Sequence, residues 1–189
     1  MKSQYTIVAY WSWIAIGLVW LPGYFTSKKP SGVPNLAVQI PTSALLIIGF
    51  ALLLNPGSHA LDLQVTPHIA ILGVVGLVLD LVGIGFAMWA RLALGTNWSG
   101  MFMTIKQGHE LVQTGPYAIV RHPIYAGLLL AMAGTALTIG TLSCYLGVAA
   151  GLVALMIRVS IEENLMREQF DETHEAYRRR TKKLIPFVW

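Results

Sequence analysis

Five long apolar stretches, separated by shorter polar segments, dominate the chain. A helix needs about 20 mostly apolar residues to cross the roughly 30 Å hydrocarbon core of a bilayer. The stretches cover residues 5–25, 36–54, 69–94, 124–139 and 142–161. We therefore predict an all-α, polytopic membrane protein with five transmembrane helices. The fourth stretch is the shortest, and because only Gly140 and Thr141 separate it from the fifth, these two helices are expected to form a tight hairpin.

The composition supports this class of protein. Of 189 residues, 55% are hydrophobic and 12% are charged, whereas soluble domains carry about 25% charged residues. The length fits one domain, so residues 1–189 are expected to form a single unit. A lone cysteine, Cys144, excludes a disulfide framework. The third stretch contains four glycines that we expect to allow close helix packing, and these are Gly73, Gly76, Gly83 and Gly85.

Positive charge is distributed unevenly along the chain, whose formal net charge is +4. It is concentrated at Lys28, Lys29, Arg91, Lys106, Arg121, Arg178–Arg180, Lys182 and Lys183. With five spans they all fall on one side, and only Lys2 opposes the pattern. The positive-inside rule then places the N-terminus outside, and the third loop and the C-terminal tail in the cytoplasm. For the basic tail, anionic membrane lipids are a better partner than nucleic acid in so hydrophobic a chain.

Two segments flank the last two spans. Residues 95–121 form a polar, glycine-rich cytoplasmic loop, long enough to reach back over the helices. Because Pro123 suits the first position of a helix, His122 and Tyr125 are expected at a helix N-terminus, where free backbone donors favour anionic groups. Beyond Glu163 the helical pattern continues and predicts a C-terminal cytoplasmic helix with an apolar face.

Asp80 and a cluster of three charged side chains near the end of the fifth span are candidates for function. Arg158 and Glu162 are four residues apart and share a helix face, whereas Glu163 lies about 100° around the helix. Charges close to lipid are costly and usually mark function. An ordinary ion pair between Arg158 and Glu162 at the membrane boundary is the alternative. Asp80, in the middle of the third span, is expected to be a protonated acid bonded to a neighbouring helix, although it could also line a tunnel for a lipid acceptor.

Five motifs follow one another between residues 96 and 189. They are His109-Glu-Leu-Val112, Gly115-Pro-Tyr117, Arg121-His-Pro-Ile-Tyr-Ala-Gly127, Arg158-x-x-x-Glu162-Glu163, and Tyr177 with Leu184-Ile-Pro186. Together they resemble the isoprenylcysteine carboxyl methyltransferase family, part of an integral-membrane superfamily that also includes phospholipid N-methyltransferases. Residues 1–95 match it only in hydropathy. The resemblance implies a three-span scaffold over 1–95 and a cofactor-binding and catalytic half over 96–189.

The resemblance also implies an S-adenosylmethionine-dependent enzyme, with S-adenosylhomocysteine as its product and with no metal. The cofactor-binding residues it implies are His109, Glu110, Leu111, Val112, Tyr117, His122, Pro123, Ile124, Tyr125, Glu162 and, more weakly, Glu163. Arg158 is implied as the catalytic residue that faces the methyl acceptor. The planar guanidinium of Arg158 suits a carboxylate, so we expect carboxyl O-methylation of a lipid-like, isoprenylcysteine-type substrate. The alternatives are N-methylation of a phospholipid headgroup and a non-catalytic lipid-binding module.

Three residues depart from the pattern of the family, and one of them is Met103, which stands roughly where eukaryotic members have a glutamine. Asp171 stands where the family often has glycine, and His174 stands where it often has tyrosine. The C-terminal helix is therefore expected to dock in its own way. The sequence makes no prediction about the oligomeric state.

Overall fold

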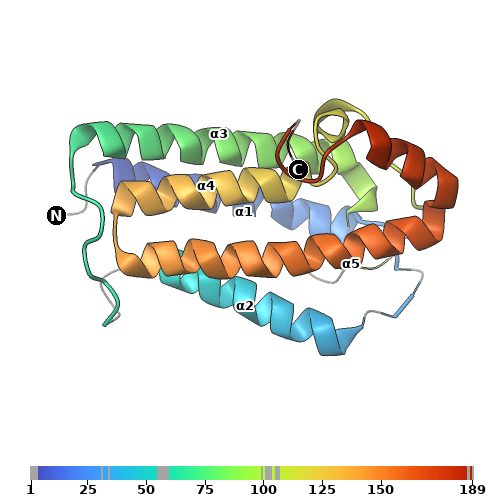
Figure 1. Cartoon of the computed structure of the whole chain (residues 1–189), viewed down its shortest axis with the longest axis horizontal. Coiled ribbons are helices and arrows are strands. Elements are labelled where there is room, and N and C mark those ends of the chain that lie inside the picture. Colours follow the sequence, from blue (N-terminus) through green and yellow to red (C-terminus); the bar gives the residue numbers. More distant parts are fainter. Residues whose placement is uncertain are drawn as a thin grey trace.

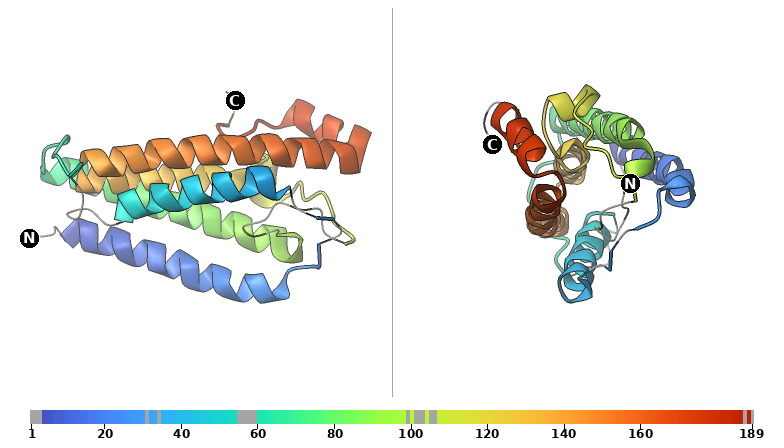
Figure 2. Two further views of the ribbon diagram at one scale, coloured as in Figure 1. Left: turned by 90° about the horizontal axis from the view of Figure 1, so that it is seen from below. Right: turned by 90° about the vertical axis from the view of Figure 1, so that its right-hand side faces the viewer.

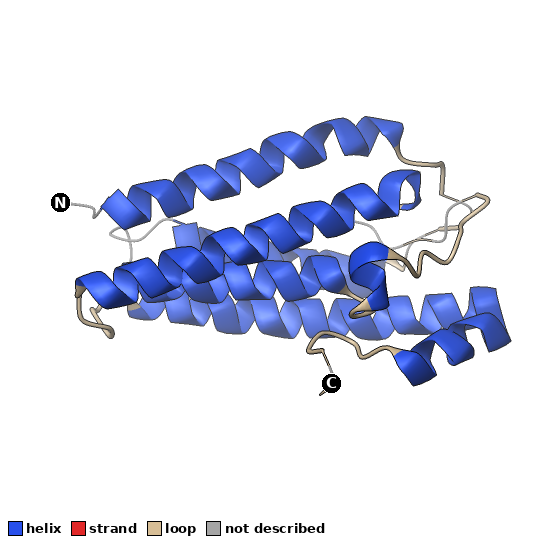
Figure 3. Ribbon diagram, turned by 90° about the horizontal axis from the view of Figure 1, so that it is seen from above, coloured by secondary structure: helices blue, strands red, loops and turns tan. Residues whose placement is uncertain are grey.

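The computed structural model describes residues 4–30, 32–33, 35–54, 60–98, 100, 104, 107–186 and 188. Its main elements are five α-helices, which Figure 1 shows running side by side along the long axis. They are α1 (Gln4–Thr26), α2 (Leu36–Leu54), α3 (Ala70–Leu94), α4 (Pro123–Ile139) and α5 (Leu142–Arg180), with the short 3₁₀ helices η1 (Gly95–Asn97) and η2 (Gly115–Ala118). Helices account for all the regular elements of the described residues, as Figure 3 shows. The all-α prediction is confirmed.

Four of these helices, α1, α2, α3 and α5, are long and apolar enough to cross a membrane. The fifth, α4, has 17 residues, which corresponds to about 25 Å of helix. Large apolar side chains cover the outer faces of the bundle, among them Leu18 on α1, Ile47 on α2 and Ile71 on α3. Such a surface suits lipid and not water. The protein is therefore an integral membrane protein with several spanning helices.

Glycines bring α3 and α4 into backbone contact. A Cβ atom added to Gly83 would lie 2.4 Å from the backbone nitrogen of Ala131, and one added to Gly76 would lie 2.7 Å from the carbonyl oxygen of Gly134. Gly73 faces the ring of Tyr5 on α1 in the same close way. The packing prediction is confirmed for these three glycines. It is wrong for Gly85, which has open space where a side chain would stand.

A buried polar group joins three helices in the middle of the bundle. The Asp80 carboxyl on α3 lies 2.6 Å from the Ser12 hydroxyl on α1, and the Thr135 hydroxyl on α4 donates to it over 2.8 Å. Trp13 Nε1 donates to Thr135 over 2.9 Å. Asp80 is fully buried. These contacts agree with the expected bonding of Asp80 to neighbouring helices.

The last helix reverses direction near its end. Asp171 has φ 39° and ψ −113°, which interrupts α5, and Figure 1 shows the final part folding back along the bundle. The expected C-terminal helix is thus the end of α5, bent at the position where the related family often has glycine. A residue with a side chain rarely adopts such a positive φ, so Asp171 is a strained position.

The two ends of the bundle differ. One end carries the α4–α5 hairpin, where Gly140 takes a left-handed conformation with φ 80° and accepts hydrogen bonds from Val65 and Thr66. The other end carries η2 and the folded-back end of α5, as the views in Figure 2 show. The predicted tight hairpin is confirmed. The long loop and the C-terminal tail are thereby brought together at the opposite end.

Candidate active site

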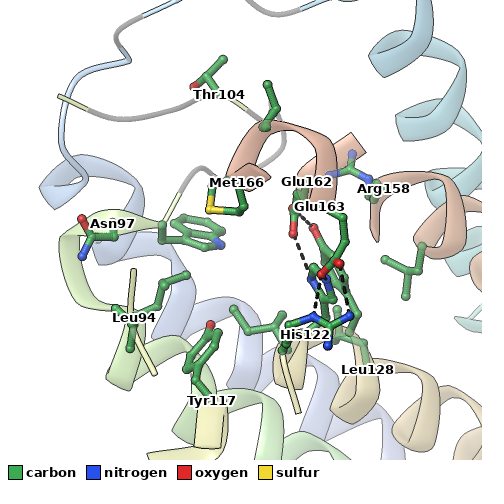
Figure 4. Close-up of a pocket in the computed structure, with 18 of the residues that line it drawn as sticks. Leu94, Asn97, Thr104, Tyr117, His122, Leu128, Arg158, Glu162, Glu163 and Met166 are labelled. Carbon is green, nitrogen blue, oxygen red and sulfur yellow. Dashed lines mark hydrogen bonds and ion pairs between the residues drawn. The ribbon is translucent and has the colours of Figure 1, made fainter. Parts of the chain in front are cut away.

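A cavity of about 440 Å³ lies where the long loop meets the helices. All five helices, the loop and the end of α5 contribute to its walls. Figure 4 shows side chains from these elements pointing into a common space. The cavity is therefore a chamber at one end of the helix bundle.

The cavity brings together nearly all of the residues that the sequence singled out. Lining it are His109, Glu110, Leu111, Val112, Tyr117, His122, Ile124, Tyr125, Arg158, Glu162 and Glu163. Pro123 is the exception, since it is buried at the first position of α4. As expected, Pro123 starts the helix and His122 precedes it. The roles of these residues toward a ligand stay predictions.

Glu162 presents its carboxylate to the cavity. Its side chain is 27% exposed, and its Oε2 lies 3.3 Å from His122 Nδ1. The Tyr125 hydroxyl donates a hydrogen bond to Oε1 of the same carboxylate. The His122 and Tyr125 rings stack with their planes 7° apart. Glu162 is therefore held in place but keeps access to a ligand.

Glu163 is instead enclosed by cationic groups. Arg121 donates from Nε to Glu163 Oε1 over 2.9 Å and from Nη2 to Oε2 over 3.1 Å, a two-pronged geometry of the strong kind. His122 Nε2 lies 2.9 Å from Oε1, and Arg178 Nε lies 3.4 Å from Oε2. Glu163 is 5% exposed. Its carboxylate fixes the neighbours of the site, whereas Glu162 faces the ligand space.

His122 lies between the two carboxylates. A neutral imidazole carries a proton on one ring nitrogen only, but here each nitrogen faces a carboxylate oxygen. Burial opposes the charged form, yet the hydrogen bonds to Glu162 and Glu163 outweigh it and raise the pKa of His122. The imidazolium therefore links the two acids.

Arg158 is almost fully buried at the cavity wall, with 3% exposure. Its Nη2 donates to Ser43 Oγ on α2 over 2.8 Å. Its Nε is buried and has no hydrogen-bond partner among the described residues. The proposed ion pair with Glu162 is not found within this part of the chain, because Glu162 is engaged by Tyr125 and His122. Arg158 thus offers an unused donor beside the cavity.

The loop that carries His109 to Val112 is tied to the α1–α2 connection. Lys28 Nζ donates to Asn97 Oδ1 over 2.9 Å and to the Gly108 carbonyl over 2.6 Å. The Gln107 amide donates to the Lys29 carbonyl over 3.0 Å. One lysine therefore holds the loop against the end of α3.

The C-terminal tail closes the back of the site. Val120 and Lys182 form a parallel bridge, the Arg121 amide donates to the Lys182 carbonyl over 2.8 Å, and the His122 amide donates to the Lys183 carbonyl over 3.0 Å. The Tyr177 hydroxyl donates to the Tyr117 carbonyl over 2.6 Å. Burial raises the pKa of the Tyr117 hydroxyl. We call the pairing of residues 120–122 with 181–183 the C-terminal clasp.

Several cavity residues were not predicted as site residues. Arg121 lines the cavity and pairs with Glu163, and Ser43 anchors Arg158. Arg121 could have been found, because two acids near lipid require a cation. Ser43 could not, since it lies in a stretch without charge. The cavity thus draws on both the 1–95 and the 96–189 parts of the chain.

Among the described residues, no group of three or more His, Cys, Asp or Glu side chains is placed to hold a metal ion.

The arrangement defines a helical integral membrane protein with a charged chamber at one end of its bundle. The chain belongs to the phospholipid methyltransferase family, whose model matches residues 71–173. The match begins in α3 and ends just beyond the bend of α5, so it contains most of the residues that line the chamber. The membership suggested by the motifs is confirmed at this level.

Individual relatives are distant. The chain is 32% identical over 115 residues to the cobalt-zinc-cadmium resistance protein CzcN of Cupriavidus metallidurans, covering 58% of this chain and 49% of that protein. It is 30% identical over 108 residues to the nickel-cobalt-cadmium resistance protein NccN of Alcaligenes xylosoxydans xylosoxydans, with 56% and 50% covered. It is 29% identical over 119 residues to protein-S-isoprenylcysteine O-methyltransferase of Xenopus laevis, with 62% and 41% covered. The chain spans about half the length, or less, of these relatives.

Proposed function

We propose that the protein is an S-adenosylmethionine-dependent integral-membrane methyltransferase that transfers the methyl group to the carboxylate of a lipid-like molecule. The observation that carries this proposal is Glu162, whose carboxylate faces the cavity while Tyr125 and His122 hold it beside the start of α4. Family membership supports the reaction class, and the similarity to protein-S-isoprenylcysteine O-methyltransferase of Xenopus laevis supports a carboxyl acceptor.

The residues present fit the cofactor. The cavity volume of about 440 Å³ falls within the roughly 300–1,000 Å³ of pockets that hold small ligands. Glu162 offers a carboxylate for the ammonium group, and the first turn of α4 offers backbone donors for the carboxylate. The Tyr117 and Tyr125 rings line the cavity, and aromatic faces attract a sulfonium cation. The His109–Val112 segment completes this wall.

Arg158 is proposed to orient the acceptor. Its Nε, which has no hydrogen-bond partner within the described part of the chain, and its hydrogen bond to Ser43 suit the two oxygens of a carboxylate. When bound, S-adenosylmethionine supplies an electrophilic methyl group. A site that held the acceptor oxygen in position for this transfer would lower the activation barrier by up to roughly 7–11 kcal/mol through orientation alone. The carboxylate is already ionised, so the protein needs no general base.

The second candidate is N-methylation of a phospholipid headgroup, which the description of the family favours. An ammonium acceptor must first lose a proton. His122 is a poor base for this step, because both of its ring nitrogens are occupied by carboxylates. A carboxyl acceptor is therefore the better fit to this cavity.

Radiolabelled S-adenosylmethionine tests the reaction with purified protein and lipid extract. Volatile, base-labile label is expected for a methyl ester, whereas stable label in lipid would indicate N-methylation.

Calorimetry with S-adenosylhomocysteine tests the site. Glu162→Ala is expected to weaken binding at least tenfold, about 1.4 kcal/mol, because a charged hydrogen bond is lost. Equal binding by both proteins contradicts the assignment, and no saturable binding by either favours a lipid-binding module.

The proposal includes a topology of five spans with the cavity end in the cytoplasm and the N-terminus outside. The support is the gathering of Lys28, Arg121 and Arg178 at that end. An impermeant maleimide added to whole cells is expected to label a cysteine introduced at Leu61 but not one introduced at Arg179. The reverse pattern contradicts the orientation.

A further inference from the structure

A second, smaller pocket lies behind the C-terminal clasp. Its volume is about 250 Å³. Its walls are formed by Arg121, Glu175, Arg178, Arg179, Thr181, Lys182, Lys183 and Val188. Five of these side chains are cationic and one is a carboxylate. A pocket with this charge favours an anion.

The backbone around this pocket is fixed. The Thr181 amide donates to the Tyr177 carbonyl over 3.2 Å, and the clasp pairs Lys182 and Lys183 with the segment before α4. Arg121 Nη1 donates to the Thr181 carbonyl. The cationic side chains therefore start from a rigid frame, unlike those of a solvated charge run in a loose tail. Preorganisation of this kind lowers the cost of binding.

Not all of the positive charge is neutralised within the protein. Arg178 Nη1 pairs with Glu175 Oε2 over 2.8 Å, and Arg121 pairs with Glu163. Arg179 and Lys182 are exposed, and neither side chain has an ion-pair partner among the described residues. Two cationic heads are thus available to a ligand that enters from outside.

The surroundings of the pocket point to lipid as the source of the anion. The tail lies beside the start of α4, where an apolar helix begins, as Figure 1 shows. Ile185 is 53% exposed and Val188 is 72% exposed next to the basic residues. Exposed apolar side chains next to lysine and arginine are typical of segments that lie at the boundary between headgroups and acyl chains.

We propose that this pocket binds the phosphate of an anionic phospholipid headgroup, with Arg179 and Lys182 as its main contacts. The lipid is a resident of the membrane and not the methyl acceptor, because neither Glu162 nor Arg158 lines this pocket. Arg121 lines both spaces and forms the wall between them. The inference requires only the membrane class of the protein, so it stands or falls independently of methyl transfer.

The test uses the full chain in neutral detergent and compares two pairs of substitutions. Arg179→Gln with Lys182→Gln removes two charges from the pocket, and Lys29→Gln with Arg167→Gln removes two exposed charges elsewhere. Native mass spectrometry measures the binding of phosphatidylglycerol, with phosphatidylcholine of the same chain length as the zwitterionic control. A photoreactive phosphatidylglycerol then locates the contact by peptide mapping. Circular dichroism verifies that each variant keeps its helices.

We expect wild type and the control variant to bind phosphatidylglycerol in preference to phosphatidylcholine, with crosslinks in residues 175–188. The pocket variant is expected to bind about thirtyfold more weakly, since each basic residue near an anionic lipid contributes roughly a fivefold factor. Equal losses in both variants overturn the proposal in favour of diffuse attraction. Competition by inorganic phosphate at the same concentration as the lipid overturns it in favour of a small-anion site. Crosslinks elsewhere overturn the location.

Discussion

The adjacent acids Glu162 and Glu163 provide a sharp test of the site, because replacement by glutamine is expected to affect different properties. At Glu163 it should reduce stability, and at Glu162 it should weaken ligand binding. Glu163→Gln leaves the guanidinium of Arg121, which is 8% exposed, without its counter-charge. Breaking a buried ion pair from one side costs about 3–5 kcal/mol. Glu162→Gln removes a carboxylate that is 27% exposed and still leaves an oxygen to accept from Tyr125. Its cost in stability is expected to be about 1 kcal/mol or less.

Thermal unfolding in detergent, followed by the fluorescence of the six tryptophans, measures the difference. A domain of this size loses about 2–4 °C in its unfolding midpoint per kcal/mol, so Glu163→Gln is expected to lower the midpoint by at least about 6 °C. Glu162→Gln is expected to shift it little but to weaken binding of S-adenosylhomocysteine. If the two variants lose equal stability, or if Glu163→Gln loses none, the division between a structural and a ligand-facing acid is wrong.

Three further predictions concern the fold and the charged centre. Gly83→Ala forces a methyl group into the backbone of α4 and is expected to lower the free energy of unfolding by about 1–3 kcal/mol. Gly85→Ala meets open space and is expected to be neutral or slightly stabilising. Equal unfolding midpoints for the two variants contradict the α3–α4 packing. Asp171→Gly relieves a positive φ and is expected to raise stability by about 1 kcal/mol, so a lower midpoint speaks against the bend. Burial lowers the pKa of His122, but the hydrogen bonds to two carboxylates outweigh burial and raise this pKa above the usual 6.5. The charged imidazole therefore contributes its full stabilisation below pH 6.5. That stabilisation is lost as the pH rises through the raised pKa. His122→Gln is expected to flatten the decline of the midpoint between neutral and alkaline pH, and an unchanged slope contradicts the assignment.

The helices could be predicted because their cause is local. Length and hydropathy place the first four helices to within a residue or two of the observed bounds, and they place the start of the fifth, which continues as a polar helix to Arg180. The proline at position 123 and the glycine at position 140 mark a helix start and a hairpin through their own backbone preferences. The predicted site residues line one cavity because their motifs lie in the loop before α4, at the start of α4 and on α5, and these segments meet at one end of the bundle.

Other features depend on contacts between distant parts of the chain, which no local pattern encodes. Arg158 could pair with Glu162 by spacing, but Ser43, a serine from α2 that lies 115 positions away, takes one of its donors. Gly83 and Gly85 lie on nearly opposite faces of α3, and only the packing of the helices decides which face meets α4. The bend at Asp171 runs against the preference of its residue type, so the sequence predicts an uninterrupted helix there.

The C-terminal clasp has a consequence for biosynthesis. During translation Arg121 emerges 42 residues ahead of Glu163, and the Tyr117 carbonyl emerges 60 residues ahead of the Tyr177 hydroxyl. The first four helices can therefore be inserted while a guanidinium at the bilayer surface still lacks its counter-ion. A chain synthesised only as far as residue 180 lacks its half of the C-terminal clasp, so the pocket can be completed only after residues 181–183 have emerged.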